Sequence, residues 1–178
     1  MKKLEHKKIN RYLKWARKIS EDSTCAHRHF GAVIVKDDTI ISSGYNGTAR
    51  GCLNCGVDIP CLKDVNGDPN NIHGVVGLNE LSRYDNCPAV HAEQNAIFNA
   101  GRIGVSLVGA IMFVAEEHGK SEIPCPMCRR FIIQAGIAEV YDGIPDNYRH
   151  YDVMPDFKIK ENLWMESKLH TKNCKCKA

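Results

Sequence analysis

Two short motifs, well separated in the sequence, constrain this chain more than any other feature. His91 and Glu93 flank one alanine, and Cys125 and Cys128 lie three residues apart in Pro-Cys-Pro-Met-Cys. One imidazole and two thiolates are typical zinc ligands, and three protein ligands leave the fourth tetrahedral position open for water. Zinc makes such a water a usable nucleophile, and a carboxylate that is not a ligand can move the protons. The two motifs together predict a catalytic zinc centre, although a Cys-x-x-Cys alone also fits a structural zinc knuckle or a redox pair.

The hydrophobic pattern around these motifs alternates between helices and strands. Because strand–helix–strand units favour parallel pairing and the second and third segments form a hairpin, we expect a mixed sheet covered by helices. Gly101 and Gly136 are the expected ends of two helices. The expected elements are a helix at 8–21, strands at 31–35 and 40–45, a helix at 91–100, a strand at 108–115, a helix from 125 to 135, a strand at 137–141 and a helix at 159–170.

Length and charge place limits on the class of protein. The 178 residues favour a single domain over 1–178, with a core at about 8–142, an irregular insertion at about 46–90 and a C-terminal extension at 143–178. The net charge of +3 is too small to argue for a nucleic-acid partner. The sequence has no apolar run of membrane-spanning length and no apolar signal core. We therefore expect a cytoplasmic protein with no membrane or nucleic-acid partner.

Four segments of the chain resemble the cytidine and deoxycytidylate deaminase family, most closely its deoxycytidylate (dCMP) branch. They span much of the chain and are Gly31-Ala32-Val33-Ile34-Val35, Gly44-Tyr45-Asn46-Gly47, the Val90–Ile97 run VHAEQNAI and Pro124-Cys125-Pro126-Met127-Cys128. The resemblance implies a three-layer α/β/α sandwich with a mixed central sheet. It also implies zinc-dependent hydrolysis of dCMP to dUMP and ammonia, which supplies dUMP for dTMP synthesis. The alternatives are deamination of another nucleotide, a nucleobase or an RNA base, or a non-catalytic zinc-stabilised module.

The resemblance also implies roles for individual residues. His91, Cys125 and Cys128 would hold the catalytic zinc, and Glu93 would be the proton shuttle. Asn46 would bind the sugar hydroxyl, the Ala92 N–H the base carbonyl, and Ala32 would line the base pocket. Asn46-Gly47 is equally a common turn pair and Ala32 an ordinary core residue. Thr24, Arg28 and Arg50 are candidates for the phosphate, with solvent-exposed positions as the alternative and a neighbouring subunit as a further one for Arg50.

Nine cysteines are many for a reducing compartment, where metal binding explains such a set better than disulfides do. By resemblance to bacterial and archaeal relatives, Cys25, Cys55, Cys61 and Cys87 would form a second, structural zinc site that holds the irregular insertion. Cys52 and His73 are substitutes, and a set of unligated buried thiols is the alternative. Cys174 and Cys176 lie in a lysine-rich tail with no expected role.

The chain departs from the family at 115–123, where a longer and more charged link precedes Pro124. We expect this loop to border the pocket, with Glu116, Glu117 and His118 as substrate contacts or, preferably, as solvated residues. The family resemblance further implies a homo-oligomer, hexamers included. It also implies dCTP and dTTP as effectors, with Mg²⁺ accompanying the allosteric nucleotide.

Overall fold

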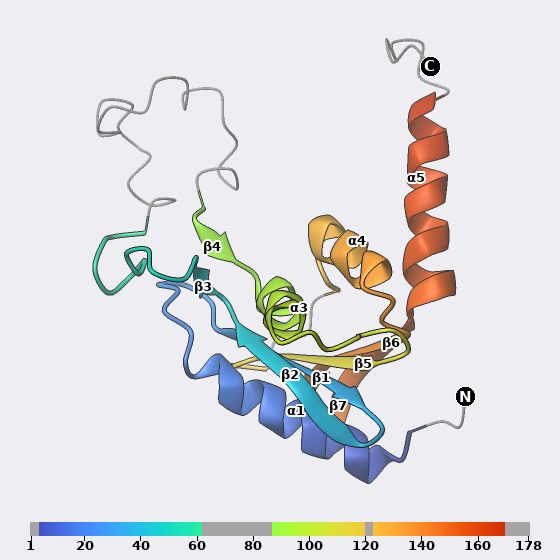
Figure 1. Ribbon diagram of the computed structural model, residues 1–178, viewed down its shortest axis with the longest axis horizontal. Helices are drawn as coiled ribbons and strands as arrows, with labels where there is room; N and C mark the ends of the chain where they lie inside the picture. The colour runs from blue at the N-terminus through green and yellow to red at the C-terminus, as the bar shows by residue number, and fades with distance from the viewer. Residues whose placement is uncertain (1–3, 62–86, 120–122, 170–178) are drawn as a thin grey trace.

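The computed structural model describes residues 4–61, 87–119 and 123–169, and its centre is a five-stranded mixed sheet (Figure 1). The strand order is β2-β1-β5-β6-β7. Only β5 and β6 pair in parallel, and the other neighbours pair antiparallel. The expected mixed sheet is therefore confirmed. The strands are β1 (Phe30–Lys36), β2 (Thr39–Tyr45), β5 (Ile111–Glu116), β6 (Glu139–Ile144) and β7 (Asn147–Asp152).

Helices cover both faces of this sheet. Helix α1 (His6–Ser20) packs on one face, and α3 (Ala92–Arg102) and α4 (Pro126–Gln134) lie on the other (Figure 1). Successive side chains of a strand point to opposite faces. In β1, Val33 and Val35 accordingly join the core under α1, whereas Ala32 and Ile34 join the core under α3. The result is the three-layer α/β/α architecture that the family resemblance implies.

Gly44, at the end of β2, allows α3 to approach the sheet closely. A Cβ atom at this position would overlap the backbone nitrogen of Ala96 and lie 2.8 Å from the carbonyl oxygen of Ala92. Because both neighbours are backbone atoms, neither can move aside as a flexible side chain would. The glycine therefore sets the distance between the sheet and the helix that begins directly after His91.

The structure shifts the expected start of β5 and the expected end of α3. Strand β5 begins at Ile111 rather than at residue 108, because Gly109 has a φ of 77° and the exposed Val108 belongs to the preceding turn. Helix α3 continues through Gly101 to Arg102. The predicted end of α4 is confirmed, since Gly136 has a φ of 73° directly after the last turn.

The C-terminal part continues the sheet. Edge strand β7 follows β6, and the π-helical turn η2 (Val153–Lys158) leads into α5 (Ile159–Leu169), which extends away from the sheet in Figure 1. The expected core ended near residue 142, whereas Val153 and Phe157 of η2 are buried in the core under α3 and α4. No helix in the described ranges combines the length and apolarity needed to cross a membrane.

The irregular insertion is tied to the fold by a small second sheet. Strand β3 (Gly47–Thr48), which follows β2, pairs antiparallel with β4 (Ala89–Val90), which directly precedes His91. Residues 62–86 between them lie outside the described residues, and so does the substitute ligand His73. The pairing brings the start of the insertion next to the first metal-ligand residue.

Candidate metal centre and substrate pocket

The structure brings the three expected zinc ligands together. The Nδ1 atom of His91 lies 3.6 Å from Sγ of Cys125 and 3.4 Å from Sγ of Cys128. With Zn–S of about 2.3 Å and Zn–N of about 2.0–2.1 Å, a tetrahedral zinc separates its nitrogen and sulfur ligands by about 3.6 Å. The donor types and their spacing therefore fit a zinc ion held by three protein ligands.

Two helix N-termini hold these ligands. His91 is the N-cap of α3, where its backbone N–H donates to Oε1 of Gln94 at 2.9 Å. Cys125 is the N-cap of α4, where its Sγ accepts from the Cys128 backbone N–H at 3.4 Å. The positive end of a helix dipole favours thiolates. The ligand residues are thus fixed by the same local bonds that start the helices.

The two sulfur atoms are electrostatically unequal without a metal. The pKa of Cys125 is lowered to about 4, chiefly because the Cys128 side chain donates a hydrogen bond to it, with further support from His91 and a backbone N–H. That same hydrogen bond to Cys125, together with burial, raises the pKa of Cys128. One proton is thus held between the sulfur atoms of Cys125 and Cys128, and a bound metal ion would take the place of that proton.

Glu93 stands beside the three ligands at the first turn of α3. Its side chain is buried, and the loss of solvation raises the pKa of its carboxyl group above the ordinary value. A carboxyl group that accepts and retains a proton more readily than a solvated one suits a proton shuttle. Glu93 therefore lies at the helix start where the sequence places it, and its buried environment is a finding of the structure.

A pocket of about 280 Å³ opens onto His91, Glu93 and Cys125. The expected substrate residues Thr24, Arg28, Asn46 and Ala92 also line it, whereas Ala32 does not. Ala32 is fully buried among the side chains of the core under α3, where it packs. Arg50, the third phosphate candidate, is also absent from the lining. Ile123 lines the pocket and belongs to the 115–123 segment that was expected to border it. Sequence reasoning missed further lining residues, which are His27, Phe30, Thr48, Pro88, Ala89 and Val114.

Phe30 is the most informative of the missed residues. It begins β1, and the Arg28 guanidinium lies over its ring at 4.7 Å from the centroid. A cation over an aromatic face is held in place by the ring quadrupole. The Arg-His-Phe order before the strand was visible in the sequence, but only the strand boundary shows that residues 28 and 30 share one side.

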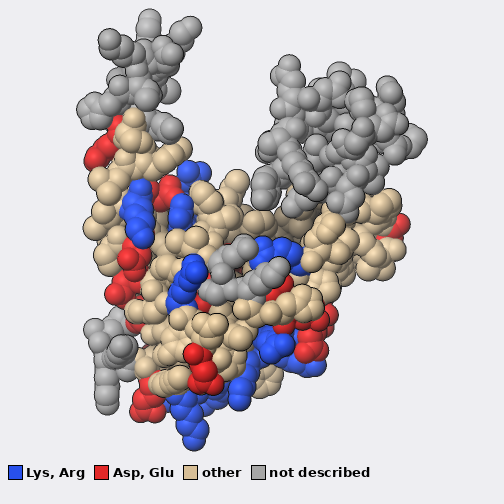
Figure 2. Space-filling view, turned by 180° about the vertical axis from the view of Figure 1, so that it is seen from behind, with Lys and Arg blue, Asp and Glu red and all other residues tan. Residues whose placement is uncertain are grey.

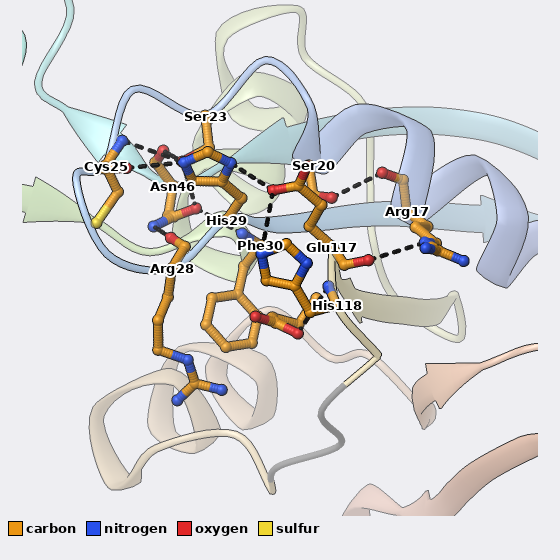
Figure 3. A network of polar contacts seen from close by, with 11 residues as sticks. Arg17, Ser20, Ser23, Cys25, Arg28, His29, Phe30, Asn46, Glu117 and His118 are labelled. Carbon is orange, nitrogen blue, oxygen red and sulfur yellow. Dashed lines mark hydrogen bonds and ion pairs between the residues drawn. The ribbon is translucent and has the colours of Figure 1, made fainter. Parts of the chain in front are cut away.

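The Asn46 side chain makes hydrogen bonds to two residues that line the pocket, Arg28 and Phe30, and to Ser23 (Figure 3). Its Oδ1 accepts from the Phe30 N–H at 2.7 Å and from the Ser23 hydroxyl at 2.8 Å. Its Nδ2 donates to the Arg28 carbonyl at 2.8 Å. A carboxamide has two donor and two acceptor positions. One N–H therefore remains for a ligand, so the structural role and the expected sugar contact are compatible.

The surplus cysteines converge on the same pocket without forming a closed cluster. Cys25, Cys55, Cys61 and Cys87 all line it, and Cys52 is exposed. Within the described ranges, only two groups of three or more potential ligands come within 4.8 Å of one another: the His91–Cys125–Cys128 set and Glu139, His150 and Asp152 on β6 and β7. The expected four-sulfur site is therefore not assembled in this structure, although its members face one cavity.

The charged segment after β5 is less solvated than expected. Glu116 is buried at the end of the strand, and its Oε2 accepts from the His118 backbone N–H at 3.0 Å. Glu117 is partly exposed, and its carboxylate lies 2.7 Å from Nδ1 of His29. Only the His118 side chain is largely exposed. The interpretation of these residues as a solvated loop was thus wrong for Glu116, whereas Glu117 is partly exposed.

Comparison with known proteins agrees with this geometry. The family model described as "Cytidine and deoxycytidylate deaminase zinc-binding region" matches residues 6–144. The deoxycytidylate deaminase of Saccharomyces cerevisiae is 33% identical over 129 residues, which cover 72% of this chain and 35% of the yeast protein. The deoxycytidylate deaminase of Enterobacteria phage T2 is 31% identical over 160 residues, covering 76% of this chain and 81% of the phage protein. This chain thus spans about a third of the yeast relative's length.

A solved structure shows the same fold. The dCMP deaminase of cyanophage S-TIM5, in complex with dCMP and dUMP, superposes with a TM-score of 0.56 at 28% identity, covering 78% of this chain and 82% of that chain. A three-layer α/β/α fold with a His-Cys-Cys centre at two helix starts defines a zinc-binding domain of the deaminase type. Given the family match over 6–144, the chain belongs to the cytidine and deoxycytidylate deaminase family.

Proposed function

We propose that this chain is a zinc-dependent dCMP deaminase that hydrolyses dCMP to dUMP and ammonia. The observation that carries the proposal is the position of Glu93, which is buried beside three potential zinc ligands and lines the same pocket as His91 and Cys125. The deoxycytidylate deaminases among its relatives and the S-TIM5 enzyme with bound dCMP and dUMP support the substrate. On the face shown in Figure 2, basic and acidic side chains are interspersed, and a small anionic substrate does not require a long basic surface.

Glu93 would carry the protons of the reaction. Zinc, when bound by His91, Cys125 and Cys128, activates water as the nucleophile. The Glu93 carboxylate would accept a proton from that water and deliver it to N3 of the cytosine ring. It would then accept the second proton, from the hydroxyl group added at C4, and deliver it to the exocyclic amino group. That group leaves as ammonia. The raised pKa of the buried Glu93 carboxyl supports its holding a proton between these transfers.

The remaining pocket residues would orient the nucleotide. The Ala92 backbone N–H would meet the base carbonyl, and the remaining Nδ2–H of Asn46 would meet the sugar hydroxyl. Arg28, whose guanidinium is held over Phe30, and Thr24 would bind the phosphate. Arg28 is the stronger phosphate ligand of the two, because guanidinium can bind phosphate oxygens in a bidentate manner.

Further family properties belong to the same proposal. A second, structural zinc would draw Cys25, Cys55, Cys61 and Cys87 together, and their shared lining of one pocket supports this. We also propose a homo-oligomer that responds to dCTP and dTTP, with Mg²⁺ bound beside the effector. Metal analysis of protein purified without chelator should find two zinc ions per chain, and one zinc per chain contradicts the second site.

The activity is tested with purified protein and a substrate panel of dCMP, CMP, dCTP, cytidine and a short RNA. We expect deamination of dCMP, with Glu93→Gln lowering kcat by about 10²–10⁴-fold while zinc content is unchanged. Glu166→Gln, at an exposed position of α5, is the matched control and should retain wild-type turnover. Turnover of another panel member with dCMP untouched would refute the substrate, and substantial turnover by Glu93→Gln would refute the proton shuttle.

A further inference from the structure

Two segments that are far apart in the sequence meet beside the pocket. The connection from α1 to β1 contributes Thr24, His27 and Arg28 to the pocket lining. The segment 117–119 follows β5 and precedes the zinc-ligand residue Cys125 in the chain. Figure 3 shows side chains of both segments in one polar network.

His29 is the side chain that joins the two segments (Figure 3). Its Nε2 donates to the Cys25 carbonyl oxygen at 2.8 Å, and its Nδ1 lies 2.7 Å from Oε2 of Glu117. The Nε2–H is a hydrogen-bond donor, and the Glu117 carboxylate lies within hydrogen-bond distance of the other ring nitrogen, so one ring contacts both segments. The imidazole thus links the connection before β1 to the segment after β5.

The backbone fixes both partners of this pair. The Glu117 N–H donates to the His29 carbonyl at 2.9 Å, which extends the β1–β5 ladder by one bond beyond the Phe30–Glu116 pair. Arg17 on α1 donates through Nε to the Glu117 carbonyl at 3.0 Å. Since its own backbone is held from both sides, Glu117 presents its carboxylate to His29 from a defined position.

The connection between α1 and β1 is also held by Asn46, independently of Glu117. The Asn46 side chain bonds to the Arg28 carbonyl and the Phe30 N–H, and the Ser23 hydroxyl donates to Asn46. Residues 24–28 are therefore attached at both ends, and the bond from the His29 ring to the Cys25 carbonyl is a further contact to this stretch. Thr24 and Arg28, which line the pocket, belong to this stretch.

We propose that His29 and Glu117 are positioning residues for the substrate site, and that the contact between their side chains sets the conformation of residues 24–28. They do not touch the reacting atoms, and they act through the pocket wall that carries Thr24 and Arg28. The inference rests on the proposed dCMP deaminase activity, with phosphate binding at that wall. It assigns a role to Glu117 in the part of the chain that departs from the family pattern.

A comparison of Glu117→Gln with wild type tests the pair. We expect KM for dCMP to rise about fivefold with kcat within about twofold, since a charge-assisted bond is lost at partly exposed residues. Glu166→Gln, at an exposed position of α5 away from the pair, is the control and should leave KM unchanged. An equal KM in Glu117→Gln and wild type, or a loss confined to kcat, overturns the proposal.

A double-mutant cycle separates the pair from two unrelated effects. His29→Gln alone should raise KM to a similar extent, and His29→Gln with Glu117→Gln should be no worse than either single variant. KM increases that multiply in the double variant contradict a shared role. Zinc content should stay at the wild-type value throughout, because none of the three proposed catalytic zinc ligands is changed.

Hydrogen exchange distinguishes failure of this inference from failure of the proposed function. If wild-type protein with bound zinc does not deaminate dCMP, the function is refuted, and the pair is then judged from backbone exchange alone. Glu117→Gln should increase exchange in a peptide covering residues 24–29 but not in one covering α1. Unchanged exchange at 24–29 overturns the inference whatever the substrate is.

Discussion

Replacing Asn46 tests directly whether its side-chain hydrogen bonds stabilise the pocket residues Arg28 and Phe30. In Asn46→Ala, the Phe30 N–H and the Arg28 carbonyl lose their side-chain partner, while the Ser23 hydroxyl keeps the Asn46 backbone carbonyl at 2.7 Å. Each lost bond costs about 1 kcal/mol, and groups left unsatisfied near the interior cost more. The free energy of unfolding should therefore fall by about 2–3 kcal/mol.

Urea unfolding of the zinc-loaded protein measures this loss. With an m-value of about 2 kcal/mol/M, the midpoint should fall by about 1–1.5 M. Asn99→Ala is a matched control, because Asn99 makes one bond to the Ser43 carbonyl at 2.8 Å and alanine regains about 0.5 kcal/mol of helix propensity. Its midpoint should shift by less than half as much. Equal shifts for the two variants would falsify the assignment of Asn46 as a structural tie.

Two further predictions concern the scaffold. Gly44→Ala should destabilise the protein by about 1–3 kcal/mol, because its Cβ overlaps the α3 backbone, whereas Gly101→Ala, with open space around it, should be neutral or stabilising in thermal unfolding. Hydrogen bonds from Tyr12 and Lys8 lower the pKa of Asp38 to about 2, so the ionised carboxylate contributes stability that is present above about pH 4 and is lost as the pH falls through 2. The stability difference between wild type and Asp38→Asn in urea should accordingly narrow between about pH 4 and 2, and a constant difference contradicts this.

Local sequence patterns were sufficient to predict the metal centre. His91, Cys125 and Cys128 each stand at or next to a helix start whose position follows from hydrophobic periodicity, and zinc restricts the ligand types. The three ligand residues could therefore be predicted to lie close together without knowledge of the whole fold. The position of Glu93 follows from the same helix start.

The pocket wall could not be predicted in the same way. The contact between His29 and Glu117 spans 88 positions of the chain, which is 117 minus 29, and depends on β1 pairing with β5. No local pattern encodes which strands are neighbours. The sequence likewise gave no sign of β7, because an edge strand with mostly polar side chains lacks the apolar alternation that identifies a strand.

Ala32 illustrates a further limit. The family resemblance placed it at the base pocket, but its zero exposure and its place among core side chains follow from the strand pleat and from the packing of α3. An alanine is small enough to serve either role. Only the position of the pocket relative to the strand decides between them.

The zinc-ligand residues lie at the N-caps of α3 and α4 and in the first turn of α4, and this location has a practical consequence for measurements on this protein. An ion that joins two helix starts binds the folded chain far better than the unfolded one, so each tenfold rise in free zinc above the dissociation constant adds about 1.4 kcal/mol to the apparent stability. Unfolding midpoints of two variants are therefore comparable only at equal free zinc. A variant that looks unstable in a chelating buffer can have an intact fold and a weakened metal site.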